Sequence, residues 1–376
     1  MWKKRSLFIV VALGVVCSAA LALLPVVRQQ HARATGGLEP AIVFKLSWGP
    51  AVHEVGFRQW PEGVQGPDTF TVDQQYFYIA DGVNRAIKIF DRSTGMLVQK
   101  IDYPELLKIR YPRVQQMLAV DKTIFLVCKG MLSGPQGESL YDFDANRWKI
   151  GNDWGPPGPA GDGWSVIIYQ NGEFKELDLA SEIPNFAGPF RLEQLPCGVM
   201  VRRDAPPEGW GNGLDQAPFA AVVDAEGKLL GVKSERYAGI YKDTPFYEID
   251  TREGPWQVKL KAYDFTGKEL KAVPIFEREG VNVFYRGSDQ KGNIYVGVKP
   301  ASLMGTSDFY VVVFSRDLAK KSEYRVTLEK ERPKEYPPNL STGEMFQVSP
   351  DGKCFNMAFR KDGFAIYQLL PVGETG

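Results

Sequence analysis

Short runs of alternating or continuously apolar residues, separated by turns, follow one another along the chain from residue 41 onward. Alternation with a period of two over 4–8 residues is typical of β-strands, and the spacing of an amphipathic helix is almost absent. The clearest group holds four runs within 33 residues: Thr69–Asp73, Tyr76–Asp81, Ala86–Asp91 and Met96–Ile101. Four antiparallel strands in this length predict one four-stranded meander, the size of a propeller blade.

A strand, a tight turn and a second strand recur along the chain. Five such hairpins are visible, at residues 86–101, 166–177, 220–232, 258–273 and 311–326. Two of their turns, Asn171-Gly172 and Glu226-Gly227, are typical hairpin turns that need a positive φ, which glycine supplies. The recurrence predicts an all-β fold built from repeated blades.

The last unit supplies only three strands, in residues 345–359 and 364–370, whereas Ala41–Trp48 is a lone strand before the first blade. Pairing the lone strand with Phe364–Leu370 would complete the last blade and remove the exposed edges of the ring. We therefore predict a six-bladed β-propeller closed by an N-terminal strand. Its 332 residues from Ala41 to Val372 give about 55 per blade, so the excess over a compact repeat lies in loops.

The first blade also resembles a known family. In the run GPDTFTVDQQYFYIADGVNRAIKIFDRSTG, the spacing of Tyr78, Asp81, Asn84-Arg85, Ile87 and Phe90 is similar to an NHL repeat. The resemblance covers about one blade of six and implies a six-bladed NHL-like propeller, a family that mostly binds protein, RNA or small ligands. It carries over no catalytic residue. We interpret Asp81, Asn84 and Arg85 as residues that stabilise a tight turn, because Asp and Asn commonly bond their own turn backbone.

A 21-residue uncharged run, Leu7–Val27, follows three basic residues at positions 3–5. A helix of that length would be about 31 Å long, which matches the core of a bilayer. Basic residues before the span place the N-terminus in the cytoplasm and the body outside. We predict that residues 1–34 form a membrane anchor or signal segment and residues 35–376 the propeller, as a single-pass protein of the cell membrane with an extracytoplasmic body. Small residues at positions 20, 22, 32 and 34 leave signal cleavage and secretion as the alternative.

Charge and rare residue types exclude several classes of function. The five basic residues before residue 35 leave 40 basic against 45 acidic side chains in the body, so nucleic acid is not an expected partner. His31 precedes the body and only His53 remains, which excludes multi-histidine zinc sites and the two-histidine iron triad. The widely spaced Cys128, Cys197 and Cys354 are interpreted as small buried residues on strands.

In a blade of strands a to d, the b–c and d–a connections open on one face, and the a–b and c–d turns open on the other. The second class is short throughout, whereas the first class contains long insertions at residues 130–163 and 205–218. All seven tryptophans of the body lie on or next to the elaborated face in this scheme. They can pack the loops, and they can also form a binding surface, since Trp is enriched at contact sites. The expected binding residues are Trp154, Trp164, Trp210, Asp153, Asp162 and Asp215.

Two further features could carry metal chemistry. Asp142-x-Asp144-x-Asn146 has the oxygen-ligand spacing found at the start of calcium loops, but Arg147 takes the place of the usual glycine. His53-Glu54 is a single pair in a connection, and a histidine satisfied by its own loop is the simpler interpretation. We predict no cofactor, with calcium as the alternative.

The sequence favours a non-enzymatic binding module for a protein, a peptide or an envelope polymer. The alternative is a metal-dependent enzyme of the lactonase or lyase kind in the central funnel. That function needs inward carboxylates, Asn or His at the start of the innermost strands. The expected starts show no consistent acid or histidine: Thr69, Gln115, Phe190, Ala238, Val281 and Met345.

Overall fold

The chain separates into two compact units, Ala41–Leu369 and a second unit that joins Met1–Pro40 to Leu370–Gly376. The computed structural model describes residues 41–60, 63–104, 113–129, 141–142, 147–148, 164–179, 181–183, 190–195, 198–203, 219–233, 246–250, 254, 257–263, 268–277, 281–303, 308–326 and 346–372. The predicted membrane anchor or signal segment lies outside these residues. Among the described residues, no helical segment has the length and apolar character of a membrane span.

Six antiparallel sheets account for most strands of the unit Ala41–Leu369, and we number them as blades 1 to 6 in chain order. Blade 1 contains β4 (Thr69–Val72), β5 (Tyr76–Asp81), β6 (Ala86–Asp91) and β7 (Leu97–Asp102). Blade 2 contains β8 (Arg113–Val120), β9 (Thr123–Lys129), β12 (Trp164–Gln170) and β13 (Glu173–Glu176). Blade 3 contains β14 (Arg191–Leu195), β15 (Gly198–Arg203), β16 (Phe219–Val223) and β17 (Leu229–Lys233).

The second half of the ring follows the same order, with one strand fewer in blade 4. Blade 4 contains β18 (Phe246–Asp250), β19 (Lys259–Tyr263) and β20 (Glu269–Pro274). Blade 5 contains β21 (Val281–Ser288), β22 (Ile294–Pro300), β23 (Phe309–Phe314) and β24 (Lys320–Val326). Blade 6 contains β25 (Phe346–Val348), β26 (Cys354–Arg360), β27 (Gly363–Gln368) and β1 (Ala41–Leu46). Small additional elements are β2 (Arg58–Trp60) with β3 (Gly63–Gln65), β10 (Tyr141–Asp142) with β11 (Arg147–Trp148), and the 3-10 turn Ala301–Leu303.

The first strand of this unit lies in the same sheet as the last three. β1 runs antiparallel to β27, with Ala41 opposite Gln368 and Leu46 opposite Phe364. The sheet order is therefore β1-β27-β26-β25, and β1 occupies the outermost place that β7 holds in blade 1. The first and last segments of the unit thus form one four-stranded blade.

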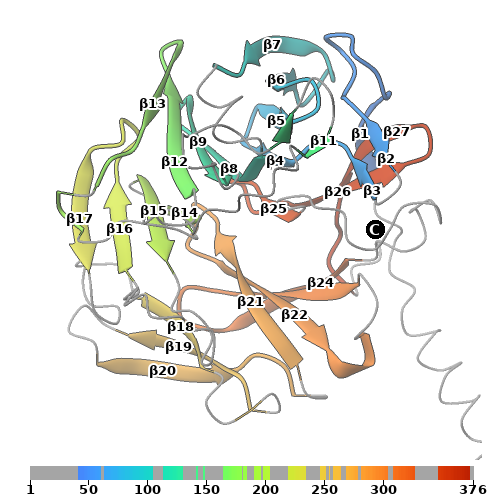
Figure 1. Ribbon diagram of the computed structural model, residues 1–376. Coiled ribbons are helices and arrows are strands. Elements are labelled where there is room, and N and C mark those ends of the chain that lie inside the picture. The colour runs from blue at the N-terminus through green and yellow to red at the C-terminus, as the bar shows by residue number, and fades with distance from the viewer. Residues whose placement is uncertain are drawn as a thin grey trace, which may run out of the picture. The chain divides into compact units, whose positions relative to one another are not determined.

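The innermost strands β4, β8, β14, β21 and β25 contact one another in that order, and β25 contacts β4 (Figure 1). β14 and β21 meet directly, although blade 4 lies between them in the sequence. The Ser288 hydroxyl of β21 donates a 2.9 Å hydrogen bond to the Gln194 carbonyl of β14. The inner strand that the sequence predicts for blade 4, from Ala238, lies outside the described residues, and β18, β19 and β20 correspond to its outer three strands.

The hydrophobic core lies between neighbouring blades rather than within one sheet. Strands such as β5 and β9 are buried on both faces because each face packs against an adjacent sheet, which explains their nearly continuous apolar runs. One cluster joins blades 6 and 1 through Phe44, Phe77, Phe90 and Phe355. Equivalent clusters join blades 1 and 2, blades 2 and 3, blades 4 and 5, and blades 5 and 6. The all-β fold with six blades predicted from the sequence is confirmed.

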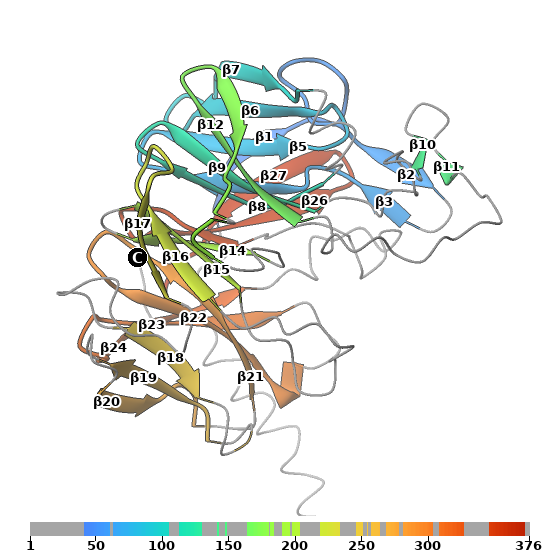
Figure 2. The same cartoon turned by 60° about the vertical axis from the view of Figure 1, so that its left-hand side comes forward.

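Local geometry agrees with the turn chemistry of the sequence. Asn171 and Gly172 have φ values of 52° and 88°, and Gly227 has 79°, so the hairpin turns use the positive φ that was expected. All four strands of blade 1 begin and end within one residue of the predicted ranges. Figure 2 shows the blades from the side, with the outermost strands β7 and β17 at the periphery.

Candidate functional site

The two faces of the propeller differ in the connections that they carry. We call the face of the b–c and d–a connections the connection face; its described part includes residues 47–57 and the strand ends at Lys129, Trp164, Arg203 and Phe219, which flank the two insertions predicted from the sequence. We call the opposite face, with the a–b and c–d turns, the turn face. Its described turns are short, at residues 73–75, 92–96, 121–122, 171–172, 224–228, 289–293, 315–319 and 349–353. A binding site is therefore expected at the polar clusters of the connection face.

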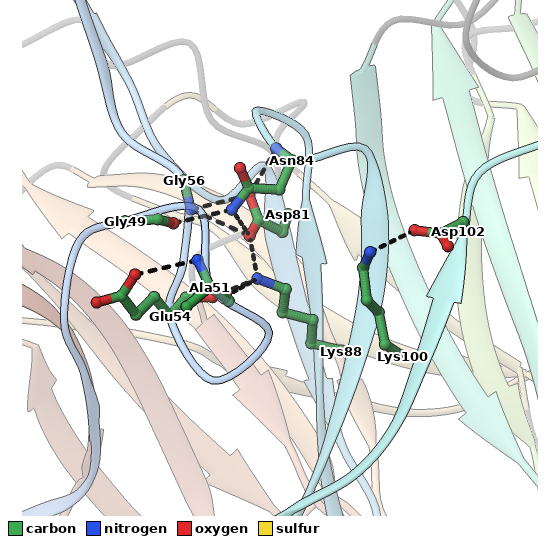
Figure 3. Close-up of polar contacts among 9 residues, drawn as sticks. All are labelled: Gly49, Ala51, Glu54, Gly56, Asp81, Asn84, Lys88, Lys100 and Asp102. Carbon is green, nitrogen blue, oxygen red and sulfur yellow. Dashed lines mark hydrogen bonds and ion pairs between the residues drawn. The ribbon is translucent and has the colours of Figure 1, made fainter.

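A fully buried ion pair fastens the loop after β1 to blade 1. The Lys88 ammonium lies 3.0 Å from Asp81 Oδ2, and neither side chain is exposed to solvent (Figure 3). The same ammonium donates hydrogen bonds to the backbone carbonyls of Ala51, at 3.3 Å, and Glu54. Because buried charges need several partners to offset desolvation, this arrangement fixes the position of the loop.

The Asp81 carboxylate receives further donors from both segments. The Gly56 N–H donates to both of its oxygens at 3.1 and 3.0 Å, and the Asn84 N–H and side-chain amide donate at 3.1 and 2.9 Å. The Asn84 amide also donates to the Gly49 carbonyl at 3.0 Å. The turn-stabilising interpretation of Asp81 and Asn84 is confirmed, and the structure adds that both residues hold a second loop. Asp81 and Asn84 of the NHL-like pattern thus hold backbone segments in place through hydrogen bonds.

A second buried carboxyl, Asp68, lies between blades 1 and 2. It accepts a 3.2 Å hydrogen bond from the Val114 N–H at the start of β8. Burial raises the pKa of Asp68 to about 7, although the Val114 N–H and the Arg113 guanidinium both act to lower it. The Tyr103 hydroxyl is buried and makes no hydrogen bond among the described residues, and burial together with Asp68 raises its pKa. Asp68 is thus a carboxyl that changes charge near neutral pH.

Three residues are cross-strand neighbours on blade 2 at the connection face. Arg113 on β8 pairs with Lys129 on β9, and Lys129 pairs with Trp164 on β12. The Lys129 ammonium is 5.4 Å from the centroid of the Trp164 ring, a distance at which cation and ring attract. Lys129 is exposed and the other two are half-buried. We call Arg113, Lys129 and Trp164 the blade 2 row.

Trp164 is the one sequence-predicted binding residue that the structure describes. It packs against the core between blades 2 and 3 and also forms part of the blade 2 row, so its packing is against the blades themselves rather than against a long loop. Trp48 packs as well: its indole N–H donates to the Arg360 carbonyl at 3.0 Å and its ring lies on Phe57 and Phe359. The other predicted residues lie outside the described residues: Trp154, Trp210, Asp153, Asp162 and Asp215.

Sequence reasoning missed Asp68, Arg113 and Lys129. Arg113 and Lys129 become neighbours of Trp164 through strand register, which fixes which ends of β8, β9 and β12 lie together. Lys129 directly precedes the first long insertion, and Trp164 directly follows it, so the two flanks of that insertion were the available signal. Asp68 offered a weaker signal as an acid placed between a proline and an apolar strand.

The cysteines, His53 and the calcium candidate are the remaining residues that could carry metal or redox chemistry. Cys128 and Cys354 are buried free thiols on strands, and burial raises the pKa of each, as expected for small apolar residues. Cys197 lies outside the described residues, as do Asp144 and Asn146 of the calcium candidate. His53 is exposed in the loop after β1. Within the described residues, no group of three or more His, Cys, Asp and Glu side chains could hold a metal ion.

The chain has distant structural similarity to known proteins. No family model matches the chain, and no curated protein matches it. The NHL resemblance therefore stays a prediction from the first blade. Similar solved structures include a streptogramin B lyase, with 12% identity, a TM-score of 0.36, and coverage of 81% of this chain and 93% of the other.

Two further solved structures are similar at the same level. The WD40 β-propeller domain of Doa1 shares 9% identity at a TM-score of 0.38, covering 89% of this chain and 94% of the other. Kuenenia stuttgartiensis hydrazine synthase shares 10% identity at 0.36, covering 80% and 95%. Likeness at these identities and scores carries no argument about activity, and the six-bladed arrangement rests on the chain's own sheets.

Proposed function

We propose that this chain is an extracytoplasmic, membrane-tethered binding module that captures a protein, a peptide or an envelope polymer over the connection face of blades 2 and 3. The observation that supports the proposal is the blade 2 row. It places a large aromatic ring beside the Lys129 ammonium at the end of a rigid sheet, with Arg113 as the next cross-strand neighbour. Aromatic and arginine side chains are the usual anchors of binding interfaces.

The surroundings of the row favour binding as well. Lys129 and Trp164 are the residues on either side of the insertion at 130–163, so that segment begins and ends at the row. The second insertion, at 205–218, lies between β15 and β16 of blade 3 in the sequence, and the flanking strand ends are on the connection face. Long connections on a rigid scaffold are where proteins usually carry recognition. Trp154, Trp210, Asp153, Asp162 and Asp215 belong to these insertions and extend the proposed surface.

Tethering to the membrane rests on the 21-residue uncharged span behind three basic residues. Fractionation and protease treatment of intact spheroplasts test it directly. We expect the chain to stay with membranes after alkaline extraction and its body to be accessible to protease from outside. A body that is protected from protease contradicts this part of the proposal.

The binding surface is tested with a photo-crosslinking amino acid at each end of β9. One position is Lys129, in the blade 2 row, and the other is Lys122, an exposed residue in the turn at the opposite end of the same strand. We expect a discrete crosslinked partner from position 129 and none from position 122. Trp164→Ala should weaken binding by about 1–4 kcal/mol if Trp164 is an anchor, and Trp164→Phe should recover part of it.

Equal crosslinking from the two positions contradicts this proposal, because the connection face would then have no preference. An unchanged crosslink from position 129 in the Trp164→Ala variant contradicts the anchoring role. Thermal unfolding of both Trp164 variants serves as the control for folding, since the ring also packs against the core of blades 2 and 3.

A further inference from the structure

The outermost strands of the propeller share an irregularity near the turn face. In β7, Leu97 lies opposite Phe90 and Gln99 lies opposite Ile89, so Val98 is an extra residue without a partner. Such a β-bulge bends the strand and re-aims the extra side chain. The same arrangement is present in four other outermost strands.

The extra residue is apolar in four of these five strands. It is Leu230 in β17, between the pairs of Leu229 and Gly231, and Leu270 in β20, between the pairs of Glu269 and Lys271. It is Val43 in β1, and the exception is Lys321 in β24. Blade 2 has a regular outermost strand. A bulge blunts an exposed sheet edge whatever its side chain, so edge protection does not explain why the residue is apolar.

Four of the exposed large apolar side chains in the described part of residues 41–369 occupy these bulge positions. Seven large apolar side chains there are exposed: Ile42, Val43, Val52, Met96, Val98, Leu230 and Leu270. Six of them lie at the turn-face ends of the outermost strands, because each such strand begins at the turn face. The exception is Val52, in the loop on the connection face.

We propose that the turn face rests on a lipid surface, with Val43, Val98, Leu230 and Leu270 as shallow apolar contacts around its rim. This inference rests on the proposed membrane tether. The predicted span ends at Val27, and 13 residues separate it from Ala41, which begins β1 at the turn face.

The distribution of the contacts favours a lipid surface over a compact protein partner. The four residues belong to blades 6, 1, 3 and 4, on opposite sides of the ring (Figure 1), so a broad planar partner can meet them together. Interfacial binding scales with the apolar area that is buried and with attraction to anionic lipids. Lys321 occupies the equivalent place in blade 5 and would meet anionic headgroups. This orientation leaves the connection face turned away from the membrane and open to a partner.

The experiment uses the full chain reconstituted into vesicles of phosphatidylcholine and phosphatidylglycerol. Cys17 and Cys197 are replaced by serine, while the buried Cys128 and Cys354 stay. Single Val98→Cys, Leu270→Cys and Val52→Cys variants then carry an environment-sensitive fluorophore. Val52 is the matched control, because its exposed fraction of 52% is close to the 54% of Val98 and the 57% of Leu270, while it lies on the other face.

Quenchers attached to shallow positions of the lipid chains should reduce the fluorescence of labels at Val98 and Leu270 by roughly two-fold or more relative to the label at Val52. Equal quenching of the three labels overturns the proposal, even when alkaline extraction shows that the chain is anchored. Loss of the chain from the vesicles contradicts the tether itself. Self-quenching of the Val98 label between chains, without quenching by the lipid, would assign the turn face to a second copy and overturn the lipid contact. Unchanged thermal unfolding of each labelled variant checks that the exposed substitutions leave the fold intact.

Discussion

Replacement of Lys88 by methionine should destabilise the protein far more than replacement of another lysine of the same blade. Lys88→Met keeps the length and apolar stem of the side chain but leaves the buried Asp81 carboxylate without its cation. It also removes the ammonium donor from the carbonyls of Ala51 and Glu54, of which Ala51 keeps the Glu54 N–H at 3.0 Å. Breaking a buried pair by removal of one partner costs about 3–5 kcal/mol. Because Asp81 keeps the donors of Gly56 and Asn84, we expect about 3 kcal/mol.

The matched control is Lys100→Met. Lys100 lies 2.7 Å from Asp102, and both side chains are partly or largely solvent-exposed, at 35% and 68% (Figure 3). Pairs of this kind are worth about 0–1 kcal/mol, since water screens them. Urea unfolding followed by tryptophan fluorescence gives both free energies of unfolding. Trp48 is a useful reporter because the loop held by Lys88 begins next to it.

A double variant separates the cost of the unpaired Asp81 charge from the cost of replacing the Lys88 side chain. Asp81→Asn together with Lys88→Met removes the orphaned charge while keeping an acceptor for the Gly56 N–H, so it should be more stable than Lys88→Met alone by about 1 kcal/mol or more. If Lys88→Met costs no more than Lys100→Met, the reasoning that the buried pair holds the loop is refuted.

Two other predictions concern the core. Asp68 has a folded-state pKa of about 7 against an ordinary value of 3.8, so its ionisation opposes folding: the free energy of unfolding should fall as pH rises from about 4 to 7 and level off above. Asp68→Asn should flatten this slope, which is worth on the order of 4 kcal/mol at most, and a slope that persists in urea titrations of the variant would assign it to another group. Phe44→Ala removes a buried ring of β1 that lies 4.9 Å from Phe90 and 5.3 Å from Phe77, so calorimetry should show a loss of about 3–5 kcal/mol. A loss below about 1 kcal/mol would mean that β1 contributes little to the ring.

The sequence predicts the fold well because its signals are local. Alternation with a period of two and the turn residues Gly172 and Gly227 are each visible within a few residues. The pairing of β1 with β27 follows from the count of strands rather than from any single residue. The direct contact of β14 with β21 could not be predicted, because it depends on the arrangement of the innermost strands of all the blades around the central axis.

Polar side chains show the limit of the same reasoning. Asp81 and Asn84 were interpreted correctly within their own turn, yet nothing near them in the sequence points to Gly49 and Gly56, which lie more than twenty residues away and close against them. Lys88 lies in the middle of the mostly apolar strand β6 and is fully buried. The alternating pattern of the sequence predicts either an exposed lysine or a buried apolar residue at such a position, and not a buried charge.

The position of the bulges relates the proposed lipid contact of the turn face to the proposed binding of a partner at the connection face. A blade has two ends, and each described outermost strand with a bulge carries it near the turn-face end. The insertions and the blade 2 row lie at the other end. A soluble propeller has no reason to concentrate exposed apolar side chains at one end of its outermost strands, because water is the same at both ends. An asymmetric surrounding gives such a reason: a bilayer on the side of the turns and an aqueous partner on the side of the connections account for both sets of residues with one orientation.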